Sequence, residues 1–407
     1  DGRNSGESLN NALEKSLSNF GINVKNIGLV TTPLLYFAAK KNKSKSGVMI
    51  TGSHNPKNYN GVKLIINDKP ISGSEIYKLI NQSKNQSDCA GKILKVDIKD
   101  IYIKEVINNI KIKGEEKLKV VIDCGNGAAG CIAPRLYREL GCEVVELFTE
   151  IDGNFPNHHP DPGKLENLSY LINKVKSTKA DLGLAFDGDG DRVGLVSNKG
   201  DVVFPDKIMM ILSQDILSKK KGSIIFDVKC SNALPDIIKS LNGTPIMSPT
   251  GHFHIKNAIR EHNPLLAGEM SGHIFFNDKW YGFDDGHYSG ARIIELILNK
   301  DKSISSMIKK LPILFSTPEL NITVTEENKF QIIEEFTKKC NLNGEKITID
   351  GLRINFKNGW GLIRASNTTP KLVLRFEGNS QRDLETIQSK FIDELSRICT
   401  YIDINLD

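Results

Sequence analysis

The stretch that decides the fold reads Asp181-Leu-Gly-Leu-Ala-Phe-Asp187-Gly-Asp189-Gly-Asp191-Arg192. It begins as a short apolar run, which is typical of a strand buried on both faces of a parallel sheet. The strand leads directly into a loop in which three carboxylates alternate with glycine. Ligands of α/β proteins bind where such strands end, so the stretch indicates an α/β fold with a functional loop at a sheet edge.

Short β-branched runs recur on both sides of this stretch, and segments with helical periodicity separate them. Two runs end at Asp123 and Asp227, and each is followed by a polar turn and a helix, which predicts tandem domains of related α/β fold. After residue 312 the chain becomes rich in strands, which predicts a smaller α+β domain. The predicted strands are 47–51, 119–123, 181–186, 223–227, 265–267, 320–325, 346–350, 352–356, 361–363 and 372–376; the predicted helices are 128–140, 167–176, 206–218 and one that spans 384–398.

Composition excludes several classes of protein. The chain has 407 residues, of which 39% are hydrophobic and 25% charged, so it is an ordinary globular protein rather than a disordered one. No apolar run approaches the ~20 residues of a membrane-spanning helix. The net charge is only +5, with 54 Lys and Arg against 49 Asp and Glu, and the basic clusters are short, which disfavours a nucleic-acid partner.

The cysteines and the first residues bear on location. Seven cysteines without a C-x-x-C pair indicate neither a disulfide framework nor a thiolate metal site, and they fit a reducing cytoplasm. The chain starts at Asp1-Gly2-Arg3 without Met or an apolar leader, so we expect no signal peptide and a start that has been cut away. Nothing in the sequence indicates an obligatory protein partner.

The acidic loop is the strongest candidate for a metal site. Asp187, Asp189 and Asp191 can surround one hard cation, because the glycines between them let the backbone curl. An EF-hand is excluded, since Arg192 and Asn198 stand where its Gly and Glu are required. A solvated acidic turn is the weaker alternative, because three like charges this close repel one another without a cation. Oxygen ligands with no His or Cys nearby point to Mg²⁺.

A second polar loop presents a serine. Residues 51–56 form a tight turn that would hold Ser53 outward, with His54 beside it and Lys63 further along the chain. A plain polar turn is the commoner fate of such a string. A hydrolase nucleophile is disfavoured, because the G-x-S-x-G pattern is absent.

Two more loops have the chemistry to hold a phosphosugar. In loop 268–273, Glu269 and Ser271 could bracket neighbouring hydroxyls as acceptor and donor, although a structural Glu is the alternative. Loop 364–370 combines the forked guanidinium of Arg364 with several hydroxyl and amide side chains, which suits a phosphate; an unliganded Ser/Thr turn is the alternative. Together the four loops indicate phosphoryl transfer to a phosphosugar.

These loops resemble those of the phosphohexomutases. The family's phosphoserine loop matches 51–56, its metal loop 187–192, its sugar loop 268–273 and its phosphate loop 364–370; further matching stretches are 121–127, 152–163, 226–230, 250–252 and 280–285. The resemblance implies three tandem α/β domains with mixed sheets and a smaller α+β C-terminal domain, in a heart shape around a central cleft. We expect domain boundaries at 1–99, 100–202, 203–312 and 313–407.

The resemblance also implies roles for individual residues. Ser53 would carry the phosphoryl group, and Asp187, Asp189 and Asp191 would hold Mg²⁺ together with an oxygen of that group. The expected substrate-binding residues are Lys229, Gly251, His252, Glu269, Ser271, His273, Arg364, Ser366, Asn367 and Thr368. Of these, Glu269 and Ser271 would read the sugar hydroxyls, and the four residues from 364 onward would hold the non-reacting phosphate.

The implied reaction converts hexose 6-phosphate and hexose 1-phosphate, with mannose and glucose as sugars, through a phosphoserine enzyme and a hexose 1,6-bisphosphate. Glucose 1,6-bisphosphate would serve as activator. Lys63 and Arg192 would neutralise the transferring group, with His54 beside the serine and His273, or secondarily His252, as the proton-transfer group. The alternatives are a phosphoglucosamine mutase and a catalytically silent sugar-phosphate binder.

Overall fold

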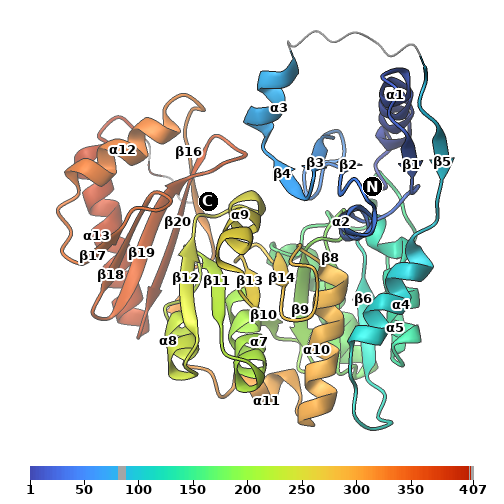
Figure 1. Ribbon diagram of the computed structural model, residues 1–407. Coiled ribbons are helices and arrows are strands. Elements are labelled where there is room, and N and C mark those ends of the chain that lie inside the picture. Colours follow the sequence, from blue (N-terminus) through green and yellow to red (C-terminus); the bar gives the residue numbers. More distant parts are fainter. Residues whose placement is uncertain (81–88, 403, 405–407) are drawn as a thin grey trace.

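The computed structural model describes residues 1–80, 89–402 and 404. Figure 1 shows the chain as successive units, from a blue N-terminal unit through green and yellow ones to an orange and red C-terminal unit. Within the described residues, no helix has both the length and the apolar character needed to cross a membrane.

The second unit contains the strand that precedes the acidic loop. Its elements are β6 (Lys119–Asp123), α5 (Ala133–Glu139), β7 (Glu143–Leu147), α6 (Ser169–Thr178), β8 (Leu182–Phe186), β9 (Val193–Ser197) and β10 (Val202–Val203). The sheet order is β10-β9-β8-β6-β7; β6 is parallel to β7 and β8, and β9 runs antiparallel to β8. Every residue of β8 is buried, as its apolar run predicts.

The third unit repeats this topology. Its elements are α7 (Pro205–Lys219), β11 (Ser223–Asp227), α8 (Ala233–Ser240), β12 (Thr244–Ser248), α9 (His252–His262), β13 (Leu266–Gly268), β14 (Ile274–Phe276) and α10 (Gly286–Lys300). β11 is parallel to β12 and β13, and β14 runs antiparallel to β13. The order β12-β11-β13-β14 therefore corresponds to β7-β6-β8-β9. The predicted tandem repeat is confirmed, and Asp123 and Asp227 occupy equivalent strand ends.

The first unit carries two small sheets. Its elements, together with the helix that follows them, are α1 (Gly6–Asn19), β1 (Val24–Asn26), α2 (Thr32–Lys41), β2 (Gly47–Ile50), β3 (Val62–Ile66), β4 (Lys69–Ile71), α3 (Gly73–Ile80), β5 (Ile93–Lys95) and α4 (Lys99–Asn109). β1 and β5 form a parallel pair, and β2, β3 and β4 form an antiparallel sheet. The serine loop lies between β2 and β3.

The C-terminal unit is an antiparallel sheet with helices. Its elements, after the connecting α11 (Ile304–Ile308), are β15 (Phe315–Ser316), β16 (Leu320–Thr323), α12 (Lys329–Lys339), β17 (Glu345–Ile347), β18 (Leu352–Phe356), β19 (Gly359–Ala365), β20 (Lys371–Gly378) and α13 (Gln381–Ile398). The path of the sheet is β15-β20-β19-β18-β17, and β16 also pairs with β20. Figure 1 shows α12 and α13 together on one side of this sheet. The α+β architecture is confirmed.

The hydrophobic cores divide the molecule differently from the sheets. One large core runs through the first three units and includes Phe37 of α2, Tyr102 of α4 and Trp280. The C-terminal unit has its own core, which contains Phe376 and Phe391. The first three units therefore share packing that fixes them to one another, while the last one folds around a separate core.

One predicted helix is wrong in detail. The segment predicted as a single helix over 128–140 is a short 3₁₀ turn (Ala128–Cys131) followed by α5, with Ile132 outside helical geometry between them. Pro134 fits a helix start at this point, because it lies in the first turn of α5, where its missing N–H costs no hydrogen bond within the helix.

Candidate functional site

The acidic loop directly follows β8. Asp187, Asp189 and Asp191 are all fully buried, and their carboxylates each offer an oxygen within 4.8 Å of the others. Gly190 has φ +75°, and a Cβ there would lie 2.9 Å from both His287 Nε2 and Thr31. The loop therefore requires glycine at this position to bring the carboxylates together.

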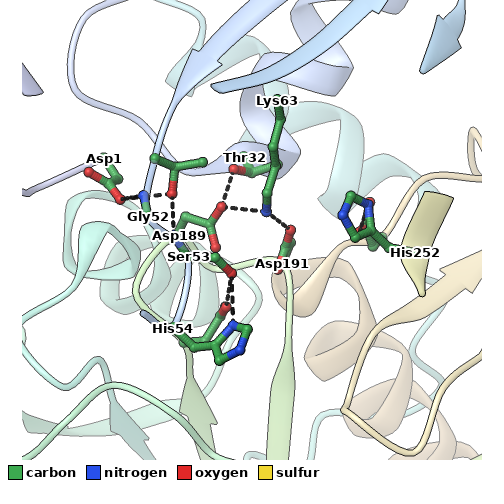
Figure 2. Close-up of polar contacts among 12 residues, drawn as sticks. Asp1, Thr32, Gly52, Ser53, His54, Lys63, Asp189, Asp191 and His252 are labelled. Atoms are coloured by element: carbon green, nitrogen blue, oxygen red, sulfur yellow. Dashed lines mark hydrogen bonds and ion pairs between the residues drawn. The ribbon is translucent and has the colours of Figure 1, made fainter. Parts of the chain in front are cut away.

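Lys63 of β3 lies between two of these carboxylates. Its Nζ is 2.7 Å from Asp189 Oδ2 and 2.5 Å from Asp191 Oδ2, and Figure 2 shows it reaching between them. Thr32 of α2 donates a further hydrogen bond of 2.5 Å to Asp189. Burial alone would lower the pKa of Lys63, but Asp189 and Asp191 outweigh it and hold that pKa well above its usual value. Lys63 is therefore a charged ammonium within the acidic loop.

Lys63 and Thr32 do not satisfy all of the carboxylate oxygens of the loop. Burial, together with the charges of Asp191 and Asp189, raises the pKa of Asp187 well above its usual range. Asp189 Oδ1 and Asp191 Oδ1 are buried, and no hydrogen bond from the described part of the chain reaches them. Buried carboxylate oxygens without donors are costly unless a cation binds them. The arrangement fits a divalent metal ion held by oxygen ligands.

Ser53 faces this loop. Its Oγ lies 3.2 Å from Asp187 Oδ2 and 3.3 Å from His54 Nδ1. The backbone of Ser53 has φ +48°, a left-handed conformation that is uncommon for residues other than glycine. Arg192 and then burial lower the pKa of His54 to about 2, so its imidazole is neutral at physiological pH. Sequence analysis predicted this group of residues, and the structure brings them together.

Arg3 is a residue of this site that sequence analysis missed. Its guanidinium is almost fully buried, and it donates to four backbone carbonyls of the serine loop, those of Ser53, Asn55, Pro56 and Tyr59, at 2.6–2.9 Å. Asp1 accepts hydrogen bonds from the Thr51 hydroxyl and the Gly52 N–H of the same loop (Figure 2). No spacing in the sequence links residue 3 to a loop about fifty positions away.

Loop 152–163 contacts both the serine loop and Arg192 of the acidic loop. His159 Nε2 lies 2.5 Å from the carbonyl oxygen of His54, and Asp161 Oδ1 lies 4.0 Å from Arg192 Nη1. The sequence analysis matched this stretch to the family without giving either residue a role. Its histidine and carboxylate are the only signal that could have marked it.

Arg192 connects the acidic loop to the sugar loop. It forms a β-bridge with His273, and its Nε donates a hydrogen bond of 3.0 Å to His273 Nε2. The other ring nitrogen, Nδ1, faces Asp284 Oδ2 at 3.2 Å, and Asp284 also lies 2.7 Å from Lys256 Nζ. Because Nε2 accepts a hydrogen bond, the neutral imidazole carries its proton on Nδ1, toward Asp284.

His252 is more open than His273. The two rings lie 5.5 Å apart, but the His252 side chain is 37% exposed and the His273 side chain 3%. Figure 2 shows His252 set apart from the group around Ser53 and Lys63. Both imidazoles therefore lie near the acidic loop, and they differ in how easily a ligand could reach them.

The sugar loop holds a buried carboxylate against a backbone amide. Glu269 accepts a hydrogen bond from the N–H of Gly251, and the Ser271 hydroxyl lies 3.5 Å from its other oxygen. Burial raises the pKa of Glu269 above its usual value. Lys229, in the loop after β11, pairs at 2.5 Å with Glu319 of the C-terminal unit. Its positive charge opposes the rise in the pKa of Glu269.

The phosphate loop begins at the end of β19, which contains Arg364. Arg364 is buried and donates through Nε to Asp350 at 2.8 Å. Ser366 Oγ accepts from the backbone amide of Thr368 at 3.3 Å, and the exposed Asn367 donates to the carbonyl of Thr250 at 3.2 Å. We call Arg364, Ser366, Asn367 and Thr368 the phosphate clamp. The contact at Thr250 places this clamp against the loop that begins α9.

Comparison with known protein families identifies the family to which the chain belongs. Four family profiles match in chain order: phosphoglucomutase/phosphomannomutase α/β/α domain I at residues 1–88, domain II at 100–200, domain III at 204–315 and the C-terminal domain at 319–394. The chain belongs to the phosphoglucomutase/phosphomannomutase family.

Individual phosphohexomutases agree over nearly the whole chain. A phosphomannomutase/phosphoglucomutase of Pseudomonas putida is 50% identical over 98% of this chain and 86% of its own length. A phosphoglucomutase of Neisseria gonorrhoeae is 47% identical over 96% of this chain and 86% of its own. A probable phosphoglucosamine mutase of Methanopyrus kandleri is 29% identical over 96% of this chain and 88% of its own.

Solved phosphohexomutase structures share the fold. The crystal structure of a phosphoglucomutase/phosphomannomutase family protein from Burkholderia thailandensis superposes with a TM-score of 0.92 at 43% identity, over 100% of this chain and 89% of that one. The Aspergillus fumigatus N-acetylphosphoglucosamine mutase, solved with GlcNAc-6P and magnesium, has a TM-score of 0.61 at 15% identity, over 95% of this chain and 93% of that one. At that identity the likeness concerns the fold alone.

Proposed function

We propose that the chain is a phosphomannomutase/phosphoglucomutase that interconverts hexose 6-phosphate and hexose 1-phosphate. The observation that carries the proposal is the position of Ser53, whose Oγ lies 3.2 Å from Asp187 in a loop of three buried carboxylates. The names of relatives about half identical to this chain support mannose and glucose as its sugars.

The reaction proceeds by two transfers at one serine. Phospho-Ser53 donates its phosphoryl group to the free hydroxyl of the bound hexose phosphate: the bond from Ser53 Oγ to phosphorus breaks, and a bond from the sugar oxygen to phosphorus forms. The resulting hexose 1,6-bisphosphate turns over and returns its other phosphoryl group to Ser53. The serine is thus restored, and the sugar leaves with its phosphate at the other position.

Positive charge around the serine stabilises the transferring group. The Lys63 ammonium reaches the acidic loop from β3, and the guanidinium of Arg192, at the end of that loop, lies 3.9 Å from Asp187. Asp187, Asp189 and Asp191, with an oxygen of the Ser53 phosphoryl group, would hold Mg²⁺, which when bound supplies further positive charge to that group. Arg3 fixes the carbonyls of the serine loop, so the loop keeps its position as the phosphoryl group leaves and returns.

The proton of the attacking sugar hydroxyl goes to a histidine. We propose His273, which accepts it at Nε2 when the substrate takes the place of Arg192 there. His252 is the alternative, because its side chain is the more exposed of the two. His54 stays neutral beside Ser53 and orients its oxygen.

Substrate recognition falls to the sugar loop and the phosphate clamp. Glu269 and Ser271 would hold neighbouring hydroxyls, Lys229 and Gly251 would contribute beside them, and the phosphate clamp would bind the non-reacting phosphate. Glucose 1,6-bisphosphate would act as activator, because it would phosphorylate Ser53 in enzyme that carries no phosphoryl group. We further propose a cytoplasmic location and activity without an obligatory protein partner, on the sequence evidence alone.

A coupled assay tests the proposal. The enzyme, with Mg²⁺ and glucose 1,6-bisphosphate, should convert glucose 1-phosphate and mannose 1-phosphate to the 6-phosphates. Ser53→Ala should lower kcat at least ~10³-fold, while Ser44→Ala, at an exposed serine of the same unit, should leave it unchanged. Preferred turnover of glucosamine 6-phosphate would instead favour a phosphoglucosamine mutase. Tight binding of hexose phosphates without turnover would favour a silent binder.

A further inference from the structure

Asp350 connects two loops that belong to different units. It lies in the turn between β17 and β18, and its Oδ2 accepts from Arg364 Nε at 2.8 Å and from the backbone N–H of Thr250 at 2.9 Å. The first contact is within the C-terminal unit, and the second crosses to the third unit. One carboxylate oxygen therefore binds both the phosphate clamp and the loop at the start of α9.

The turn that carries Asp350 is held close to β19, the strand that contains Arg364. Leu352 pairs with Ile363 in the β18–β19 ladder. Gly351 has φ +73°, and a Cβ there would lie 2.2 Å from the Ile363 carbonyl oxygen and 2.7 Å from Arg364 Cα. Only glycine permits this approach, so the position of Asp350 relative to Arg364 is set by the backbone.

The contact with Asp350 decides which edge of the Arg364 guanidinium is available. Nε is bound to the carboxylate, while Nη2 is buried and has no hydrogen-bond partner in the described part of the chain. A guanidinium is a rigid planar fork, so binding of Nε fixes the direction of the remaining donors. A phosphate at Nη2 would satisfy a donor that the folded chain leaves unpaired.

The contact with Thr250 extends the connection to the sugar loop. The next residue, Gly251, donates its N–H to Glu269, and Asn367 of the phosphate clamp donates to the Thr250 carbonyl at 3.2 Å. Asp350 and Asn367 thus hold both the N–H and the C=O of Thr250. Any displacement of the clamp moves the backbone that Glu269 binds.

We propose that Asp350 is a positioning residue of the mutase: it orients Arg364 toward the non-reacting phosphate. The inference rests on the proposed function. Because the non-reacting phosphate is held equally in the ground state and the transition state, loss of this orientation weakens binding more than it slows chemistry.

The test is a double-mutant cycle in steady-state kinetics with glucose 1-phosphate. Asp350→Asn should raise KM ~10-fold and change kcat less than ~3-fold. Arg364→Ala should raise KM further, and adding Asp350→Asn to it should change KM less than ~2-fold. The substitution removes the charge that faces Arg364 but keeps an oxygen that can accept from the N–H of Thr250. Asp393→Asn, on an exposed position of α13, is the control and should match the parent.

The outcomes separate the two claims. An inactive parent enzyme would overturn the proposed function, whereas an active parent with a parental KM in Asp350→Asn would overturn the role of Asp350 alone. Independent, multiplying effects of the two substitutions would also overturn it. If Asp350→Asn does not fold, Asp350→Glu replaces it in the same cycle: the retained but displaced charge should raise KM ~3-fold in the parent and not in Arg364→Ala.

Discussion

The acidic region and the phosphate clamp differ in how deeply their polar residues are buried and in which core supports them. We use "acidic region" for Ser53, Lys63 and the three aspartates of loop 187–191. Its three aspartates are fully buried, and the units that carry them and Ser53 share one hydrophobic core. The clamp lies on a unit with a separate core, and Asn367 and Thr368 are exposed at its tip. The reacting phosphoryl group is thus expected to meet a rigid site, and the non-reacting phosphate one that can release and bind again.

The largest effect should come from the acidic region. Asp187→Asn keeps the size of the side chain and removes the carboxylate charge that would bind the metal ion and that lies 3.9 Å from Arg192 Nε. We expect kcat to fall ~10³-fold with KM nearly unchanged, because the lost stabilisation acts on the transferring group. Chelation of divalent metal in the parent should give a loss of similar size that Mg²⁺ restores. A ten-fold rise in KM at constant kcat would contradict the view that the acidic region acts on the chemical step.

Substitution in the phosphate clamp should have a smaller effect, and it should change KM rather than kcat. Arg364→Lys retains a positive charge but loses the forked donors and the bond from Nε to Asp350. We expect KM for glucose 1-phosphate to rise ~10-fold while kcat changes less than ~3-fold. Lys338→Arg, at an exposed position of α12, is the matched control. An equal fall in kcat and kcat/KM would show that the clamp acts on the chemistry instead.

The smallest effect concerns stability in acid. His287 is fully buried behind Gly190 of the acidic loop, and burial lowers its pKa to about 3. The unfolded chain takes up this proton near pH 6.5, so stability is lost as the pH falls from there toward 3. Between pH 7.5 and 5 the parent should lose about 2 kcal/mol through this group.

Denaturant unfolding at the two pH values measures this loss. His287→Gln should remove that share of the loss, whatever its stability at pH 7.5, and His262→Gln, at an exposed histidine, should retain it. An identical fall in stability for the parent and His287→Gln would contradict the assignment. A selective effect would sharpen the comparison, since His287 packs against the acidic loop and not against the clamp.

Local patterns in the sequence predicted the sheets well. β6, β11 and β18 have the predicted bounds because their apolar runs end abruptly at polar residues. The acidic loop could be predicted too, since three carboxylates at alternate positions have few structural explanations. The helix over 128–140 could not, because its periodicity continues across Ile132, where the backbone leaves helical geometry.

The residues that position the site were beyond prediction for a physical reason. Arg3, His159 and Asp350 act on backbone atoms of distant loops, through carbonyls or an N–H. Backbone partners have no side-chain identity, so such contacts leave no complementary pattern in the chain. They become visible only when the fold brings the two segments together.

The most direct test of the account is where the phosphoryl group resides. The enzyme would be incubated with glucose 1,6-bisphosphate, and its intact mass and phosphopeptides measured before and after addition of mannose 1-phosphate. The account predicts one phosphoryl group on Ser53, which is transferred to mannose 1-phosphate to give mannose 1,6-bisphosphate. Completion of the cycle should then give mannose 6-phosphate and a phosphoryl group on Ser53 again. A phosphoryl group on another residue, or turnover without any phosphoenzyme, would contradict it.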